Sequence, residues 1–256
     1  MKAVVLLLLA SVFSVCSYAN DVSTLRFGVD PTYPPFESKD ASGKLAGFEI
    51  DLGNEICARI HAKCAWVEND FDGMIPGLKA RKFDAIMSGM TVTAQRAEQI
   101  SFSDKLWNSS LRLVAKKGST VLPTPEALRG KSVGVQQGTV GETYAKKNWA
   151  PKGATVVPYQ NQNLVYDDLT VGRLDGVLIG DIQAQLGFLG TPRGAGYGFV
   201  GDKIVDPSSS KGNAIGLRKD DAALRQKINQ AIADVRKDGT YERIEKKYFA
   251  FDVYGD

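Results

Sequence analysis

The sequence predicts an α/β protein of two lobes, each a sheet flanked by helices, with a cleft between the lobes. Strand-like apolar segments alternate with helix-like segments, which is typical of sheets covered by helices. The alternation falls into two runs, at 25–105 and 111–180, which suggests one sheet in each lobe. The tail has a different order, one strand and then two helices, and is expected to complete the first lobe.

The first run is predicted to contain strands at 25–29, 64–68 and 83–89, with helices at 47–60, 74–82 and 93–100. The segment GFEIDLGNEICARI has apolar residues at close to helical spacing. Thr93 suits the N-cap of the third helix. The stretch DPTYPPFES after the first strand has three prolines, so neither a helix nor a central strand is expected there.

The second run is predicted to contain strands at 111–117, 132–135, 155–159 and 175–179, with helices near 125–129, 141–148 and 162–172. The tail follows with a strand at 213–219 and helices at 221–239 and 240–249, the first ending at Gly239, a favoured residue after a helix. We therefore expect lobe 1 to comprise 20–108 with 205–256, and lobe 2 to comprise 109–204. The hinge is expected to be two strands, near 107–110 and 203–207.

The N-terminus is typical of an exported protein. Lys2 precedes an apolar run at 4–15 that is short for a membrane span, and residues 17–19 form a small-x-small cleavage pattern. We predict a signal peptide at 1–19 and an exported mature chain; a buried N-terminal helix is the alternative. Lipidation at Cys16 is disfavoured because Val15 stands where a small residue is wanted.

The composition excludes several classes of function. The net charge of +3, without a basic stripe interleaved with aromatic residues, argues against nucleic-acid binding. The sole histidine, His61, argues against a His-based metal site or catalytic triad, so no metal or cofactor is expected. Export leaves Cys57 and Cys64, for which an oxidising compartment favours a disulfide. Two buried free thiols, or a metal site short of ligands, are the alternatives.

Three loops carry candidate binding residues. In SGMTVTAQR, Ser88, Gly89 and Thr91 offer hydroxyl and N–H donors between a strand and a helix. Arg96 stands in the first turn of that helix, where a cation is unfavourable unless it shares an anion with the helix N-terminus. A solvated surface arginine is the alternative reading.

The second and third loops follow the same pattern. In SVGVQQGTVGET, backbone N–H groups near Val140 are expected to face the first loop, or to form an ordinary strand-to-helix turn. In DGVLIGD, Asp181 ends a strand and suits an ammonium ion or the capping of the next helix.

Together these loops could bind a zwitterion, with its carboxylate at Arg96 and its ammonium at Asp181. The proline-rich loop adds a second carboxylate, Asp30, and a ring, Tyr33, while Phe71 offers an opposite ring. Two rings with a carboxylate at the far end suit a cationic side chain, through cation–π contacts and ion pairing.

The motifs GVDPTYPPFE, GFEIDL, FDAIMSGMTVTAQR, SVGVQQGT, DGVLIGD and DGTYERIEKKYF occur in that order after a signal peptide. This order resembles the periplasmic polar amino-acid-binding proteins of ABC importers (solute-binding protein family 3), especially those for lysine, arginine, ornithine and histidine. The resemblance covers residues 22–254 and implies a two-lobed type II periplasmic binding protein located in the periplasm. Each lobe would be a mixed sheet flanked by helices, with a two-strand hinge and a ligand cleft between the lobes.

The resemblance also implies a role for each candidate residue. Asp30 would contact the distal cation, Tyr33 and Phe71 would stack on the side chain, and Asp181 would take the α-ammonium. A disulfide between Cys57 and Cys64 matches that subgroup. The α-carboxylate would be bound by Ser88, Gly89, Thr91 and Arg96, with a backbone N–H from Val140.

The sequence departs from close relatives at three of these places. Gly89 stands where serine is common, Val140 and Gly141 replace a more polar pair, and the spacing before Asp181 is one residue longer. These differences bear on ligand preference and on the assignment of Asp181.

The predicted function is capture of a basic L-amino acid (arginine, lysine, ornithine or histidine) by a monomer that delivers it to a membrane ABC permease. Glutamine or an opine is an alternative ligand. A periplasmic enzyme on the same fold, similar to cyclohexadienyl dehydratase, is the rival class, but the cleft is expected to lack a histidine and an acid–base pair. A receptor sensor domain is a further alternative, disfavoured because no second hydrophobic segment follows.

Overall fold

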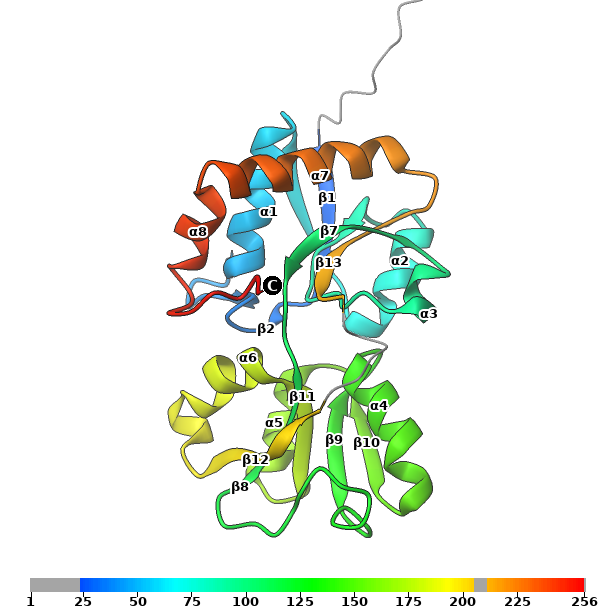
Figure 1. Cartoon of the computed structure of the whole chain (residues 1–256), viewed down its shortest axis with the longest axis vertical. Coiled ribbons are helices and arrows are strands. Elements are labelled where there is room, and N and C mark those ends of the chain that lie inside the picture. The colour runs from blue at the N-terminus through cyan, green and yellow to red at the C-terminus, as the bar shows by residue number, and fades with distance from the viewer. Residues whose placement is uncertain (1–23, 205–210, 256) are drawn as a thin grey trace, which may run out of the picture.

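The structure is a computed structural model that describes residues 24–204 and 211–255, arranged as two lobes along the long axis of the molecule (Figure 1). The predicted signal peptide lies outside the described residues. Within the described part of the chain, no helix has the length and apolar character needed to cross a membrane.

The sheet of lobe 1 has the strand order β5-β1-β6-β13-β7. β1 runs parallel to β5 and β6, whereas β13 runs antiparallel to both of its neighbours. The sheet is therefore mixed, as predicted. The strands are β1 (Thr24–Val29), β5 (Lys63–Glu68), β6 (Ala85–Ile86), β7 (Ser101–Trp107) and β13 (Asn213–Leu217).

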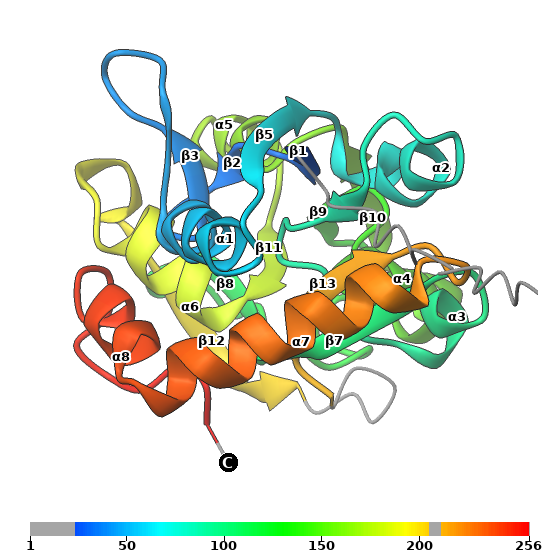
Figure 2. The same ribbon diagram turned by 90° about the horizontal axis from the view of Figure 1, so that it is seen from above.

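Helices cover both faces of this sheet. Successive strand residues point to opposite faces, so Ala85 and Ile86 belong to different apolar clusters. The Ala85 face packs against α1 (Phe48–Arg59), α7 (Ala222–Lys237) and α8 (Thr240–Glu245), and the Ile86 face packs against α2 (Met74–Lys79). Figure 2 shows α7 lying across the top of this lobe, so the C-terminal helices complete its core. The remaining helix of the lobe, α3 (Ala94–Ala97), is short.

The sheet of lobe 2 has the order β10-β9-β11-β8-β12. The strands β9, β10 and β11 are parallel, and β8 runs antiparallel to its two neighbours. Apolar clusters lie on both faces, one with α4 and the other with α5. The elements are β8 (Leu111–Lys116), β9 (Ser132–Gln136), α4 (Val140–Asn148), β10 (Thr155–Tyr159), α5 (Gln162–Thr170), β11 (Gly176–Gly180), α6 (Asp181–Gln183) and β12 (Tyr197–Ile204).

The proline-rich segment connects β1 to a small antiparallel sheet of β2 (Thr32–Tyr33), β3 (Glu37–Lys39) and β4 (Leu45–Ala46). The peptide bond between Pro34 and Pro35 is cis. Phe36 is fully buried and stacks on Trp107, with ring centroids 3.7 Å apart. This anchor fixes the loop to the core of lobe 1.

The chain crosses between the lobes at 108–110, from β7 to β8, and again between Ile204 and Lys211. Figure 1 shows the first crossing, from β7 to β8, at the waist of the molecule. The exact lobe boundaries near 108 and 205 stay a prediction, because the second one falls at the edge of the described residues.

The segment 125–129, predicted as a helix, forms turns instead. Its backbone bonds include Leu128 N–H to the Thr124 carbonyl, but Pro123, Pro125 and Gly130 leave too few residues for a helix. β7 and β12 were not predicted, because edge strands carry polar residues that mask the strand pattern. The helical stretch that continues α6 to Leu189 was also not predicted.

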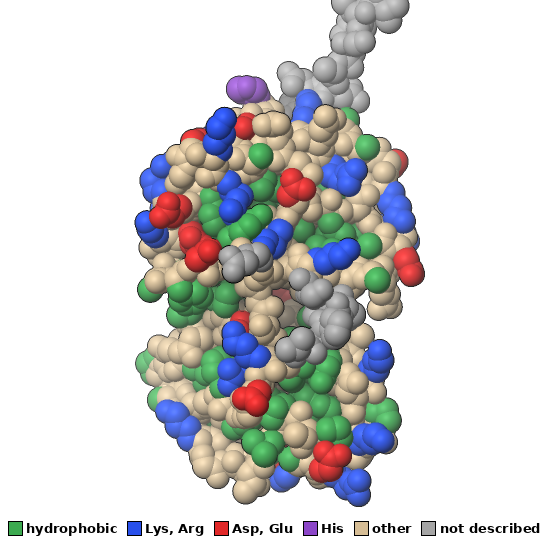
Figure 3. Space-filling model, viewed as in Figure 1, with side chains coloured by type: hydrophobic (Ala, Val, Ile, Leu, Met, Phe, Trp, Pro, Cys, Tyr) green, Lys and Arg blue, Asp and Glu red, His purple; other side chains and the backbone are tan. Residues whose placement is uncertain are grey.

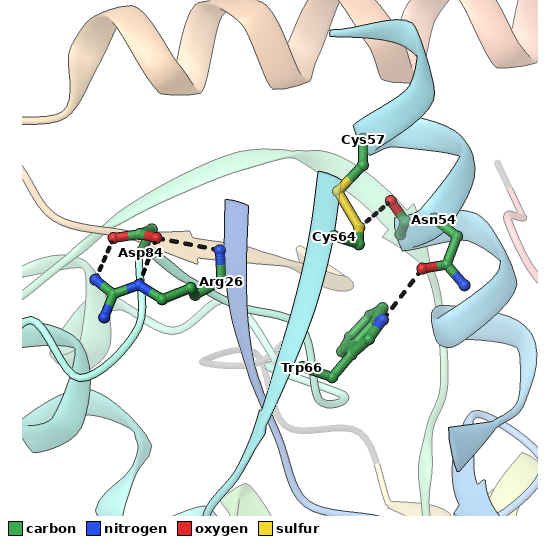
Figure 4. The surroundings of a disulfide bond; sticks show 7 residues. Arg26, Asn54, Cys57, Cys64, Trp66 and Asp84 are labelled. Atoms are coloured by element: carbon green, nitrogen blue, oxygen red, sulfur yellow. Dashed lines mark hydrogen bonds and ion pairs between the residues drawn. A yellow bond between two sulfur atoms is a disulfide. The ribbon is translucent and has the colours of Figure 1, made fainter. Parts of the chain in front are cut away.

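Cys57 on α1 and Cys64 on β5 form a disulfide with a Cα–Cα distance of 5.7 Å, which confirms the predicted bridge (Figure 4). The Cys64 Sγ lies 3.2 Å from the Gly53 carbonyl oxygen; an oxidised sulfur carries no proton, so this is a close contact rather than a donated bond. Nearby, the indole N–H of Trp66 donates to Asn54 Oδ1 at 3.1 Å. The bridge thus fastens the end of a helix to the adjacent strand.

Candidate ligand-binding site

A cavity of about 680 Å³ lies between the lobes, and Figure 3 shows the waist at which they meet. Its walls come from both sheets and from the crossing segment 108–110. All nine residues predicted to bind a ligand line this cavity: Asp30, Tyr33, Phe71, Ser88, Gly89, Thr91, Arg96, Val140 and Asp181.

The fold brings these residues together because strands of both sheets end at the cleft. Asp30 follows β1, Ser88 follows β6, Gln136 ends β9 and Asp181 follows β11. Loops beyond the carboxyl ends of parallel strands are the usual ligand site of α/β sheets. Residues far apart in sequence therefore meet at one surface.

Asp30 is a buried carboxylate, with 4% of its surface exposed. Its Oδ1 accepts a bond from the Thr32 hydroxyl at 2.8 Å, and its Oδ2 accepts one from the Gln136 side-chain amide of the other lobe at 2.6 Å. Burial raises the pKa of Asp30, and these two donors oppose the rise. Both partners are neutral, so the negative charge of Asp30 is not compensated by a cation of the described chain.

Gln136 was not recognised from the sequence. It is 4% exposed and reaches across the cleft from the last position of β9. Its position could have been noticed in the sequence, because a polar residue at the end of a buried apolar strand needs a hydrogen-bond partner. The structure gives it Asp30 as that partner.

Arg96 is 9% exposed and also lines the cavity. Its guanidinium donates to the Thr91 carbonyl at 2.7 Å and to the Gly138 carbonyl of lobe 2 at 2.9 Å. The guanidinium carbon lies 5.4 Å from the centroid of the Phe71 ring. No carboxylate of the described residues pairs with it, and burial lowers its pKa to about 10. A desolvated cation of this kind favours an incoming anion.

The predicted hydroxyl and N–H donors are already engaged inside the protein. The Ser88 hydroxyl donates to Glu37 at 3.3 Å, and the Gly89 N–H donates to Glu49 at 2.9 Å. The Thr91 hydroxyl donates to Asn213 at 2.9 Å. In this conformation, Arg96 is thus the principal donor for a ligand carboxylate.

Glu37 and Glu49 were also missed by sequence reasoning. They are 0% and 1% exposed, although glutamate is rarely buried without a partner. The position of Glu49 between the core residues Phe48 and Ile50 was a usable signal, since it opens a helix whose first turn faces the sheet.

Asp181 has several partners of its own. Its Oδ1 accepts bonds from the Ser109 hydroxyl, the Ser110 N–H and the Ile182 N–H at 2.9–3.1 Å. Its Oδ2 forms an ion pair with Lys203 at 3.0 Å. An arriving ammonium would have to displace the Lys203 side chain, which is 60% exposed and therefore free to move.

Tyr33 and Val140 complete the walls of the cavity. Val140 is the first residue of α4, and its neighbour Thr139 caps that helix by accepting a bond from the Glu142 N–H. Tyr33 approaches lobe 2 closely, because a Cβ atom at Gly180 would lie 2.6 Å from its hydroxyl. Among the described residues, no group of His, Cys, Asp and Glu could hold a metal ion.

The profile of the bacterial extracellular solute-binding proteins, family 3, matches residues 25–251. This match spans both lobes and every residue of the cavity wall named above. The chain belongs to this family. The family assignment confirms the resemblance inferred from the motifs.

Individual family 3 members are similar over nearly the whole chain. The lysine/arginine/ornithine-binding periplasmic protein of Escherichia coli K12 is 51% identical over 241 residues, 94% of this chain and 93% of that protein. The histidine-binding periplasmic protein of the same strain is 48% identical over an alignment of 259 positions, which covers 100% of both chains. These relatives are periplasmic binding proteins rather than enzymes.

Solved structures show the same two-lobed architecture. An ancestral arginine-binding protein bound to arginine is 37% identical, with a TM-score of 0.83 over 89% of this chain and 99% of that chain. The ancestral amino acid-binding protein AncCDT-1, a precursor of cyclohexadienyl dehydratase, is 30% identical, with a TM-score of 0.79 over 89% of this chain and 96% of that chain. The predicted fold is thereby confirmed.

Proposed function

We propose that this family 3 protein captures a basic L-amino acid in the periplasm and delivers it to an ABC permease. The observation that carries the proposal is the pair of uncompensated charges in one cavity. Asp30 is a buried carboxylate with neutral partners, and Arg96 is a buried guanidinium with carbonyl partners. A ligand with a carboxylate at one end and a cation at the other would neutralise both.

The residues between the two charges suit the same ligand. Phe71 and Tyr33 line the same cavity as Asp30 and Arg96, and their rings could contact an extended cationic side chain. Arginine, lysine, ornithine and histidine are the ligands in the names of the two relatives reported above. The α-ammonium is assigned to Asp181, after displacement of Lys203.

The test is isothermal titration calorimetry of the mature protein with arginine, lysine, ornithine, histidine and glutamine, repeated on Asp30→Asn. The variant keeps the size of the side chain and loses its charge. Basic ligands are expected to lose well over tenfold in affinity, because removing one partner of a buried charge pair costs about 2–5 kcal/mol. Glutamine should be spared.

Asp175→Asn is a suitable control, since Asp175 is partly exposed and pairs with Lys131 outside the cavity. It should bind all ligands like the wild type. Equal losses of affinity for basic and neutral ligands in Asp30→Asn would mean that Asp30 only stabilises its loop. That result would contradict the assignment of a basic ligand.

The protein is proposed to act as a monomer and without catalysis. A family 3 enzyme would need an acid–base group at the ligand, whereas the carboxylates of this cavity are held by hydrogen bonds within the protein. Product formation from prephenate or arogenate by the purified protein would contradict the binding role. Stimulation of ATP hydrolysis by a basic-amino-acid permease in proteoliposomes would test delivery.

A further inference from the structure

Two buried glutamates behind the cavity are not used by the proposed function. Glu37 lies on β3 and Glu49 in the first turn of α1, and both are almost inaccessible to water. No basic residue of the described chain forms an ion pair with either carboxyl. Two unpaired carboxylates in contact inside a dry core would repel each other strongly, so at most one of them carries a charge.

The hydrogen bonds indicate which glutamate holds the proton. Glu49 accepts the Trp107 indole N–H at 2.6 Å and the Gly89 N–H at 2.9 Å, as an anion would. The Oε2 of Glu37 faces no donor of the protein, as expected of the oxygen that carries a proton. Burial, followed by the charges of Glu49 and Asp30, raises the pKa of Glu37 well above its ordinary value, and its carboxyl bonds to Glu49.

These groups form a chain of donors that runs in one direction. The Asp30 N–H donates to the Ser88 hydroxyl at 2.9 Å, and that hydroxyl donates to Glu37 at 3.3 Å. Protonated Glu37 donates to Glu49. The chain thus joins the loop of Asp30 to the Ser88–Gly89 turn, both of which line the cavity.

We propose that Glu37 and Glu49 share one proton and position the Asp30 loop and the Ser88–Gly89 turn, so that ligand affinity requires the proton on Glu37. This inference rests on the proposed function. The reason is electrostatic. Loss of the proton would set three carboxylates, Asp30, Glu37 and Glu49, against one another in a low-dielectric wall. It would also remove the donor from Glu37 to Glu49, which is the last link of the chain.

The neighbouring titratable groups determine the pH range in which the titration of Glu37 can be measured separately. Asp30 and Tyr33 are the other titratable groups that interact with Glu37. Protonation of Asp30 at low pH weakens binding of cationic ligands, so titration of Asp30 makes affinity increase with pH, whereas titration of Glu37 makes it decrease. Arg96 titrates only near about 10. Below the range in which Arg96 titrates, a loss of affinity with rising pH that requires Glu37 therefore reports the proton on Glu37.

The experiment is calorimetry with arginine across this range, in buffers of different ionisation enthalpy. For the wild type, the dissociation constant should rise with pH, approaching about tenfold per pH unit above the pKa of Glu37, with uptake of one proton. Glu37→Gln keeps a donor towards Glu49 and an acceptor for Ser88, so it should bind well and show no loss of affinity with rising pH in this range. Glu126→Gln, an exposed control, should follow the wild type.

A loss of affinity with rising pH that persists in Glu37→Gln would overturn the role of the pair. A wild type that binds arginine with no loss of affinity at rising pH and no proton uptake would overturn it too. If the wild type binds no amino acid, the proposed function fails instead. In that case, infrared spectroscopy of the ligand-free protein tests whether Glu37 is protonated. The band of a buried protonated carboxyl group should be present in the wild type and absent from Glu37→Gln. Absence of that band from the wild type would also refute the proposal.

Discussion

Two charged side chains of the cavity, Asp30 and Arg96, have only neutral hydrogen-bond partners. Asp30 rests on a hydroxyl and an amide, and Arg96 rests on two carbonyl oxygens. Such partners fix each side chain in place without cancelling its charge. A ligand of opposite charge therefore finds a preorganised site and loses little conformational entropy on binding.

At this scale the first prediction concerns Arg96. Arg96→Ala should weaken binding of every amino acid by a similar factor, well over tenfold, because each ligand presents the same α-carboxylate. Calorimetry with arginine and glutamine measures the ratio between ligands. The matched control is Arg81→Ala, since Arg81 pairs with Asp220 at the surface. A loss confined to arginine would place Arg96 at the side-chain end.

The second prediction concerns protein stability and follows from the pKa of Glu37, which lies well above its ordinary value. The folded state then binds more protons than the unfolded state, so Glu37 lowers the free energy of unfolding as pH rises above about 4.5. Glu37→Gln lacks this pH-dependent contribution to the free energy of unfolding. The stability of the variant relative to the wild type should therefore increase with pH, as measured by urea unfolding at pH 4 to 8. A constant difference would show that Glu37 titrates normally.

Among the elements, α1 links the site to the core. Its first turn supplies Glu49 beneath the cavity, its middle packs on the sheet, and its last turn holds Cys57. Because Glu49 and Cys57 lie at opposite ends of this helix, mutation can test the contact below the cavity and the disulfide separately. The disulfide stabilises the end remote from the ligand.

The third prediction tests that separation. The double variant Cys57→Ser with Cys64→Ser should lose about 2–3 kcal/mol of stability, as expected for a short loop closed by a disulfide. Its melting temperature should fall by several degrees, measured by calorimetry. Arginine affinity should stay within about twofold of the wild type. A loss of affinity beyond tenfold would mean that the bridge also holds Glu49 in position.

At the level of the whole molecule, closure of the lobes depends on close backbone approach. Gly138 of lobe 2 has a φ of +75°, and a Cβ atom there would lie 2.7 Å from the Asp72 Cα of lobe 1. Its carbonyl also accepts a bond from Arg96. A side chain at this position would therefore keep the lobes apart.

The fourth prediction compares Gly138→Ala with Gly172→Ala. Gly172 has a similar φ of +78°, but a Cβ atom added there would meet nothing within 4 Å. Both variants should lose about 1–2 kcal/mol of stability from backbone strain. Only Gly138→Ala should lose arginine affinity and ligand-induced compaction in small-angle X-ray scattering. Equal affinity in the two variants would show that closure tolerates the added methyl group.

The sequence by itself determined the alternating elements, the two lobes, the disulfide and the family. These follow from local patterns and motifs, since periodicity, turn residues and the order of motifs are properties of short segments. It also named Asp30 and Arg96, because a carboxylate in a rigid loop and a cation at a helix start are unusual within their own segments.

Only the tertiary structure decided what each of these residues touches. Gln136 meets Asp30 from 106 positions away, Glu49 meets Trp107 from 58 positions away, and Lys203 at the end of β12 meets Asp181 beyond β11. Such pairings arise when strand ends converge at a cleft, and no local pattern encodes which ends converge. The turns at 125–129 and the polar edge strands β7 and β12 escaped prediction for a related reason, because packing overrides local preference there.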